Sequence, residues 1–238
     1  MEKAIIIGAS SGIGRELAIL LAEKGYALGL AARRTDLLDE LGRELHGKAH
    51  TVYMDIADPD SIDRPFNELL SSMNGADLVV ISAGTGYVNH ELNWDIEKVT
   101  VDVNVTGFMK AMNCAVRYFQ KKGTGHIVGI SSIAALRGGS ESPAYNASKA
   151  FVSNYMEGIR CMLAKSGSDV TVTDVRPGLV DTAMAKGEGL FWLIPPRVAA
   201  ECIYRAVGKK RRVQYFTARW RLVAALLSIL PERIYRKL

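Results

Sequence analysis

The sequence predicts an α/β fold in which a doubly wound parallel sheet forms a single domain, and three observations support this prediction. Short apolar runs alternate with stretches whose apolar residues recur every third or fourth position, as in parallel strands joined by helices. The apolar runs are rich in β-branched residues, which is typical of strands buried on both faces. The 238 residues are enough for one full-sized core, and no linker or internal repeat divides them.

The strands and helices follow one another along the chain with clear boundaries. The run Lys3–Ile7 ends in a glycine-rich turn, after which apolar residues recur at helical spacing as far as Gly25. We expect further strands at residues 26–32, 50–54, 77–82, 126–131 and 169–175. We expect helices at residues 36–45, 103–120 and 145–164, and another that begins at Asp58 and Pro59.

Composition excludes several classes of protein. The chain is 48% hydrophobic and 23% charged, which excludes a disordered regulator. No apolar run approaches the roughly 20 residues that span a bilayer, and the N-terminus lacks a signal-peptide cleavage site, so we expect a cytoplasmic protein. Cys114, Cys161 and Cys202 are odd in number and lie in helical patterns, which predicts buried free thiols and no metal site.

Positive charge gathers at the C-terminus. The net charge is +5, but nine basic residues and one acidic residue lie within residues 209–238, so the rest of the chain is mildly acidic. An apolar stretch at 222–230 has arginines on both sides and is too short to cross a membrane. Either residues 217–238 contact an anionic membrane peripherally, or this helix is buried against the loop near residues 182–196 or against a partner subunit. We favour burial. We expect no nucleic-acid binding, because the basic cluster has neither an interleaved stacking platform nor a recognisable nucleic-acid-binding fold.

A glycine turn joins the first strand to the first helix. Gly8, Gly12 and Gly14 have the spacing that permits a tight turn, and the N–H groups of the helix that follows could hold a pyrophosphate. The plainer alternative is a tight connection with no ligand.

Two arginines follow the second strand. Dinucleotide sites that select NAD carry an acidic residue at this position, whereas here Ala32 is followed by Arg33 and Arg34. Guanidinium groups could bracket a 2′-phosphate, which predicts a preference for NADP(H), with Arg33 the better candidate. The alternative is that these arginines merely begin a solvated helix.

A tyrosine and a lysine lie four residues apart on a predicted helix. Tyr145 and Lys149 therefore share one helix face, and a cation near the phenol, together with a positive nicotinamide, would lower the tyrosine pKa toward working pH. Ser132 ends a strand thirteen residues earlier, where its hydroxyl could orient a substrate oxygen. Without this context, the pair would be an ordinary amphipathic helix face.

Taken in order over residues 3–182, these motifs resemble the classical type of the short-chain dehydrogenase/reductase family, which has a Rossmann-like fold. The resemblance implies that Tyr145 is the acid/base, Ser132 orients the substrate, Lys149 tunes the tyrosine and binds ribose, and Asn104 holds a relay water. It makes Ser131 structural, places the adenine at Asp55, and places the nicotinamide carboxamide at the segment that begins with Pro177. The full set of cofactor-binding residues implied is Gly8, Ser10, Ser11, Gly12, Ile13, Gly14, Arg33, Arg34, Asp55, Ile56, Ser82, Ala83, Gly84, Tyr145, Lys149, Pro177, Gly178, Val180 and Thr182.

One motif departs from the family pattern. The family usually has Asn-Ala-Gly after the fourth strand, and this chain has Ser82 followed by Ala83 and Gly84. Because a hydroxyl replaces an amide with separate donor and acceptor groups, we expect this strand to be less firmly tied to its neighbours.

A glycine-interrupted segment near residues 182–196 has the composition of a substrate lid. We expect its large apolar residues to line an apolar substrate pocket, with packing on the core or on a partner subunit as the alternative. These residues are Met184, Leu190, Phe191, Trp192 and Leu193.

The sequence therefore predicts an oxidoreductase that transfers hydride between NADP(H) and a carbonyl or secondary alcohol of an apolar substrate. Residues 1–208 would form the NADP(H)-binding domain, which the basic extension 209–238 continues. The resemblance implies a homodimer or homotetramer. Two alternatives come from other classes of protein. One is a redox sensor that binds NADP(H), and the other is a membrane-peripheral protein without turnover.

Overall fold

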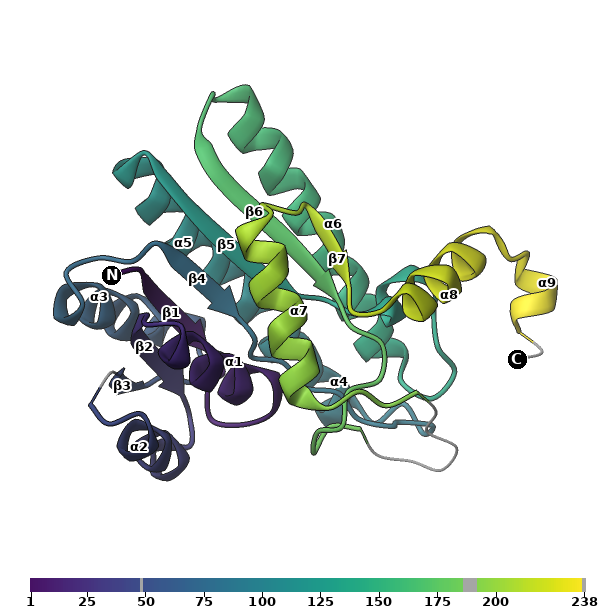
Figure 1. The fold of residues 1–238 in the computed structure, drawn as a ribbon. Helices are drawn as coiled ribbons and strands as arrows, with labels where there is room; N and C mark the ends of the chain where they lie inside the picture. Colours follow the sequence, from purple (N-terminus) through teal and green to yellow (C-terminus); the bar gives the residue numbers. More distant parts are fainter. Residues whose placement is uncertain (48, 186–191, 237–238) are drawn as a thin grey trace.

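Seven parallel strands form a single sheet at the centre of the computed structural model, which describes residues 1–47, 49–185 and 192–236 (Figure 1). The strands are β1 (Lys3–Ile7), β2 (Ala27–Ala32), β3 (Ala49–Tyr53), β4 (Leu78–Ile81), β5 (Thr124–Ile130), β6 (Asp169–Arg176) and β7 (Val213–Tyr215). Their order is β3-β2-β1-β4-β5-β6-β7, so the sheet changes its direction of growth between β1 and β4. The predicted fold class, a doubly wound Rossmann-like α/β domain, is confirmed.

Helices cover both faces of this sheet because successive residues of each strand point to opposite sides. In β1, Ala4 and Ile6 belong to one core, and Ile5 and Ile7 belong to the other. The first core is closed by α1 (Gly12–Glu23), α2 (Thr35–Glu44) and α7 (Pro196–Gly208). The second core is closed by α3 (Asp63–Ser72), α5 (Phe108–Lys122) and α6 (Pro143–Lys165).

The helix predicted at 103–120 is part of a longer helical run. It starts with α4 (Trp94–Val101), passes through a π-helical segment at Asp102–Gly107, and continues as α5. A side chain at position 107 would place its Cβ 1.9 Å from the carbonyl oxygen of Ile56, so glycine is needed for this close approach. The helix predicted from Asp58 begins with a 3₁₀ turn at Pro59–Ser61 before α3.

The basic extension contains the helix expected at 222–230, and it adds a strand and a short final helix that the sequence pattern did not predict. β7 pairs with β6 at the edge of the sheet, with Asp174 opposite Val213, and is followed by α8 (Ala218–Ile229) and the short α9 (Glu232–Tyr235). Figure 1 shows α8 and α9 projecting from one end of the molecule. Among the helices of the described residues, none combines the length and the apolar character needed to span a bilayer.

Two sequence expectations need correction. All three cysteines are free, but only Cys202 is buried; Cys114 is half-buried and Cys161 is exposed, because Cys161 lies on the face of α6 opposite the core residues Ile159 and Leu163. The apolar stretch 222–230 is only partly buried against the described part of this chain. One face of its helix packs on the protein, but Leu222, Leu226 and Ile229 on the other face are exposed, so the expected burial is wrong for that face.

Candidate active site

The glycine turn lies at the carboxyl end of β1, beside the point where the sheet changes direction. Gly8 has a φ of 92°, and a Cβ there would lie 2.4 Å from the backbone nitrogen of Ala83. A Cβ on Gly14 would lie 2.2 Å from the carbonyl oxygen of Gly8. Glycine at these positions therefore lets the turn fold tightly against β4 and opens the N-terminus of α1 toward the crevice, where its first N–H groups have no intrahelical partner.

The segment after β4 is firmly attached to β1. The backbone N–H groups of Ser82 and Ala83 both donate to the carbonyl oxygen of Ile7, at 2.8 and 2.9 Å. These bonds do not depend on the side chain at position 82. The effect of a hydroxyl in place of the family's amide at position 82 stays a prediction.

The two arginines after β2 have different neighbours. The Arg34 guanidinium donates to the hydroxyls of Ser10 and Ser11 in the glycine turn, at 3.1 and 2.5 Å. Arg33 is 60% exposed, and its Nε lies 3.8 Å from Oδ1 of Asp55. Both cations thus lie at the carboxyl end of β2, and it is Arg34 that contacts the turn.

Ser132, Tyr145 and Lys149 converge at the carboxyl end of β5. Ser132 and Tyr145 line the same cavity, and the Ser132 hydroxyl accepts a bond from the N–H of Ala134 at 3.1 Å. Lys149 is 5% exposed and donates from Nζ to the carbonyl oxygen of Ile130 at 3.0 Å. Its Nζ lies 5.7 Å from the centroid of the Tyr145 ring. The structure therefore brings the three predicted side chains together.

Burial acts on both titratable groups of this cluster. It raises the pKa of Tyr145, and the nearby Ser132 hydroxyl opposes that rise. It lowers the pKa of Lys149 to about 8, against the opposing charge of Asp174. The lowering of the tyrosine pKa that is expected from Lys149 together with a positive nicotinamide stays a prediction.

Asp174 is a buried carboxylate that sequence reasoning missed. It is 0% exposed, and its Oδ2 accepts bonds from Ser153 Oγ and Arg176 Nε, both at 2.7 Å, while Oδ1 accepts a bond from the Ser131 hydroxyl. Ser131 therefore points to this network and not toward Tyr145. An acidic residue in the interior of a strand predicted to be buried was the signal that could have revealed it.

Asn104 lies in the π-helical segment and is buried. Its Nδ2 donates to the carbonyl oxygen of Thr85 at 2.7 Å and to Ser148 Oγ at 3.0 Å, and its Oδ1 accepts from the N–H of Thr85 at 2.8 Å. A Cβ on Gly84 would lie 3.1 Å from Lys149 Nζ and 3.3 Å from Asn104 Oδ1. Asn104 and Lys149 thus both lie against Gly84. π-Helical turns like the one that holds Asn104 recur at functional sites.

The segment after β6 reaches back to the glycine turn. The carbonyl oxygen of Pro177 accepts a bond from the N–H of Ile133 at 2.9 Å, and Val180 forms a β-bridge with Ile194. A Cβ on Gly12 would lie 3.3 Å from the Thr182 methyl group, so Thr182 lies against the turn. The predicted carboxamide-binding segment and the predicted pyrophosphate-binding turn therefore lie at the same edge of the sheet, where the strands have their carboxyl ends.

A cavity of about 250 Å³ opens beside Ser132 and Tyr145. The described members of the predicted lid, Met184, Trp192 and Leu193, are largely exposed and do not line this cavity, while Leu190 and Phe191 lie outside the described residues. Met184, Trp192 and Leu193 were expected to line the substrate pocket. For the cavity formed by the described residues, that expectation is wrong. Its lining is Ser132, Ile133, Ala134, Arg137, Tyr145, Asn146, Gly178, Leu179, Leu227 and Tyr235.

The chain resembles proteins of one family over most of its length. The family model described as short chain dehydrogenase matches residues 2–190. An uncharacterized oxidoreductase of Myxococcus xanthus is 36% identical over 76% of this chain and 73% of its own. An uncharacterized oxidoreductase of Mycobacterium tuberculosis is 30% identical over 99% of this chain and 96% of its own, so the likeness extends through the basic extension.

Solved structures share the fold. An alcohol dehydrogenase from the archaeon Thermococcus sibiricus, complexed with 5-hydroxy-NADP, has a TM-score of 0.78 and 27% identity, covering 90% of this chain and 94% of its own. A short chain dehydrogenase/reductase from Burkholderia phymatum, in complex with NAD, has a TM-score of 0.85 and 20% identity, covering 94% of this chain and 92% of its own. The second likeness shows the fold alone.

The parallel sheet with a glycine turn at its switch point is the architecture of Rossmann-like dinucleotide-binding domains. Within that class of domains, the chain belongs to the short-chain dehydrogenase/reductase family.

Proposed function

We propose that this protein is an NADP(H)-dependent oxidoreductase that interconverts a carbonyl group and a secondary alcohol on an apolar substrate. The observation that carries the proposal is the convergence of Ser132, Tyr145 and Lys149 beside a cavity with a largely apolar lining. The family supports an oxidoreductase that acts on such groups. The cytoplasmic location, and a homodimer or homotetramer formed through α5 and α6, remain predictions.

The residues around the glycine turn fit a dinucleotide. The N–H groups at the start of α1 suit a pyrophosphate, and a nicotinamide bound beyond them would supply or accept the hydride. Asp55 and Ile56 would hold the adenine, and residues 82–84 would line the path of the ribose. Pro177, Gly178, Val180 and Thr182 would hold the carboxamide.

The arginines favour NADP(H) over NAD(H). No carboxylate follows β2 directly, and Arg33 and Arg34 supply two cations at that position. Guanidinium groups bind phosphate through charge-assisted bonds, whereas an acidic residue would repel it. Asp55 lies 3.8 Å from Arg33 and would compete for this cation, while Arg34 is already aligned with the turn by Ser10 and Ser11.

The chain's own residues would handle the proton. In reduction, the Tyr145 phenol donates its proton to the carbonyl oxygen while the carbon gains the hydride; in oxidation both transfers reverse. Ser132 would hold that oxygen beside the phenol, and the buried charge of Lys149 would stabilise the phenolate. Asn104 would return protons through a water held by the free lone pair of its Oδ1, since its Nδ2 hydrogens are already donated to Thr85 and Ser148.

A steady-state assay tests the proposal. NADPH oxidation would be measured with a panel of apolar, sugar and thioester-linked carbonyls, with NADH in parallel and Tyr145→Phe as the matched variant. We expect turnover with NADPH on an apolar carbonyl, and its loss in the variant without loss of NADPH binding. Tight NADPH binding with no turnover across the panel would contradict the proposal and favour the redox sensor.

A further inference from the structure

Helix α8 exposes an apolar stripe to solvent. Leu222, Leu226 and Ile229 are 73%, 54% and 78% exposed, and their spacing of four and three residues places them on one helix face. We call these three residues the outer stripe. Large apolar side chains aligned along a projecting helix mark an interaction surface more often than isolated ones do.

The opposite face of α8 is part of the active-site cavity. Trp220 and Ala224 are buried, and a Cβ on Gly178 would lie 2.2 Å from the Trp220 ring. Leu227 lines the cavity that contains Ser132 and Tyr145. One helix therefore separates the cavity from the outer stripe.

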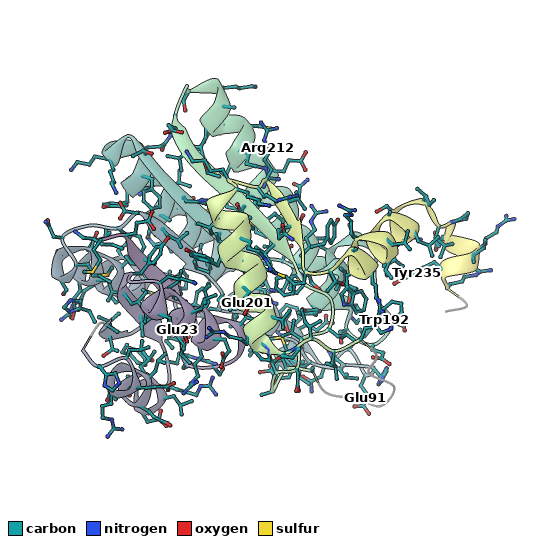
Figure 2. All side chains as sticks on the ribbon, in the orientation of Figure 1. Glu23, Glu91, Trp192, Glu201, Arg212 and Tyr235 are labelled. Carbon is teal, nitrogen blue, oxygen red and sulfur yellow. The ribbon has the colours of Figure 1, made fainter. Side chains whose placement is uncertain are left out.

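Two side chains fasten the end of this helix to the cavity rim. Arg137 donates from Nη1 to the carbonyl oxygen of Leu230 at 2.7 Å, and its guanidinium carbon lies 4.6 Å from the centroid of the Tyr235 ring. The Tyr235 hydroxyl donates to the carbonyl oxygen of Gly138 at 2.5 Å. Figure 2 shows Tyr235 and Trp192 at the end of the molecule where α8 and α9 project. These contacts hold this part of the tail in place while the outer stripe stays exposed.

Exposed arginines lie at both ends of the outer stripe. Arg219 and Arg221 precede it, Arg233 and Arg236 follow it, and Glu232 is the one acidic residue between positions 217 and 236. An apolar helix face with basic residues around it is the pattern of helices that lie in the interface of an anionic bilayer.

We propose that α8 and α9 dock on an anionic lipid surface, so that the cavity behind α8 receives a carbonyl or alcohol substrate dissolved in that membrane. The substrate part rests on the proposed function; the docking part does not. The apolar wall contributed by Leu227 suits a molecule that partitions into lipid. Entry along α8 would avoid its transfer through water.

Charge favours a membrane over a second copy of this chain. If two copies met through the outer stripe, the arginines at its ends would face arginines in either orientation. An anionic surface neutralises that charge, and the attraction weakens as salt screens it.

Co-sedimentation of the full chain with vesicles tests the docking. Phosphatidylcholine vesicles with and without phosphatidylglycerol would be compared at low and high salt. We expect binding to the anionic vesicles, weakened by salt. Arg221→Gln with Arg233→Gln should reduce the partition coefficient about 30-fold. Leu226→Gln with Ile229→Gln should reduce it by at least about tenfold.

Matched variants elsewhere on the surface control for charge and hydrophobicity. Arg64→Gln with Arg117→Gln removes the same charge, and Val99→Gln with Val101→Gln removes exposed apolar side chains from α4. These controls should bind as the wild type does. Three outcomes would each overturn the docking. The first is an equal loss of vesicle binding in the controls, and the second is no preference for anionic vesicles. The third is a dimer in sedimentation equilibrium that the outer-stripe variant dissociates.

Turnover separates the substrate part from the proposed function. A long-chain ketone presented in anionic vesicles should turn over at least about fivefold more slowly in the outer-stripe variant, while a short water-soluble ketone should turn over unchanged. An equal effect on both ketones would overturn the substrate part. Absence of turnover with either ketone in the wild type, despite vesicle binding, would instead count against the proposed function.

Discussion

Lys149 and Asp174 are two buried charges of opposite sign, on α6 and β6, and the carboxylate partly offsets the desolvation of the ammonium. Asp174 is itself held by Ser153, Arg176 and Ser131. Desolvation still dominates, because the pKa of Lys149 falls to about 8. The chain thus keeps a cation beside Tyr145 at the expense of folding stability.

Lys149→Met should therefore stabilise the fold at neutral pH while abolishing turnover. A pKa lowered from 10.5 to about 8 corresponds to about 3 kcal/mol of destabilisation below pH 8, less the loss of the Lys149 bond to Ile130. Between pH 8 and 10.5 the unfolded chain binds more protons than the folded chain, so the wild type gains stability as pH rises. The difference in unfolding free energy should shrink across that window. Urea titrations of both proteins at several pH values would check this, and an unchanged difference would refute it.

His126 should weaken the fold in acid. Its Nε2 lies 2.8 Å from Thr173 Oγ1, and burial, with a smaller contribution from Lys210, lowers its pKa to about 4. The unfolded chain binds a proton near pH 6.5 and the folded chain does not, so stability falls as pH drops from 6.5 to 4, by up to about 3 kcal/mol.

Thermal unfolding of His126→Gln across that pH range is the measurement. The variant should lose less stability on acidification than the wild type. His50→Gln changes an exposed histidine and should follow the wild-type curve. Parallel curves for all three proteins would contradict the prediction.

Arg33 and Arg34 should discriminate between the cofactors. Replacing either with Gln removes charge-assisted bonds to a 2′-phosphate, so the Kd for NADPH should rise about 10- to 100-fold while that for NADH stays within about twofold. Fluorescence titration gives both constants. Arg43→Gln, an exposed change on α2, the helix that follows Arg34, should alter neither. An equal rise for NADPH and NADH would show that the arginines do not read the phosphate.

Gly178→Ala should displace α8 from the cavity. The added methyl would lie 2.2 Å from the Trp220 ring, so the indole must move, and we expect about 1 to 3 kcal/mol of destabilisation. Gly158→Ala, inside α6 with open space around it, should instead stabilise the fold by up to about 1 kcal/mol. Differential scanning calorimetry compares them, and equal melting temperatures for the two variants would contradict the assigned contact.

Much of the fold follows from local patterns. Strands β1 to β6 are apolar runs between turns, so each could be predicted from its own residues. β7 could not, because only three residues pair and the open edge of β6 supplies the partner. The π-helical segment depends on contact between Gly107 and Ile56, which are distant in sequence.

The candidate site also has parts that local sequence predicts and parts that depend on residues distant in the chain. Ser132, Tyr145 and Lys149 lie within eighteen residues and have recognisable spacing, and the structure brings them together. The cavity wall joins Arg137 to Leu230, 93 residues further along the chain, and no local pattern encodes such a pairing. For this reason the sequence predicts that the lid segment lines the substrate cavity, whereas in the structure Leu227 and Tyr235 line it.

Transfer of deuterium from C4 of labelled NADPH to an apolar ketone tests the central claim most directly. Mass spectrometry of the alcohol should find the label on the carbinol carbon with wild-type protein, and no labelled alcohol with Tyr145→Phe, although that variant still binds NADPH. Labelled alcohol formed equally by both proteins would contradict the role of Tyr145. NADPH that binds the wild type but keeps its label with every ketone would contradict the enzyme itself.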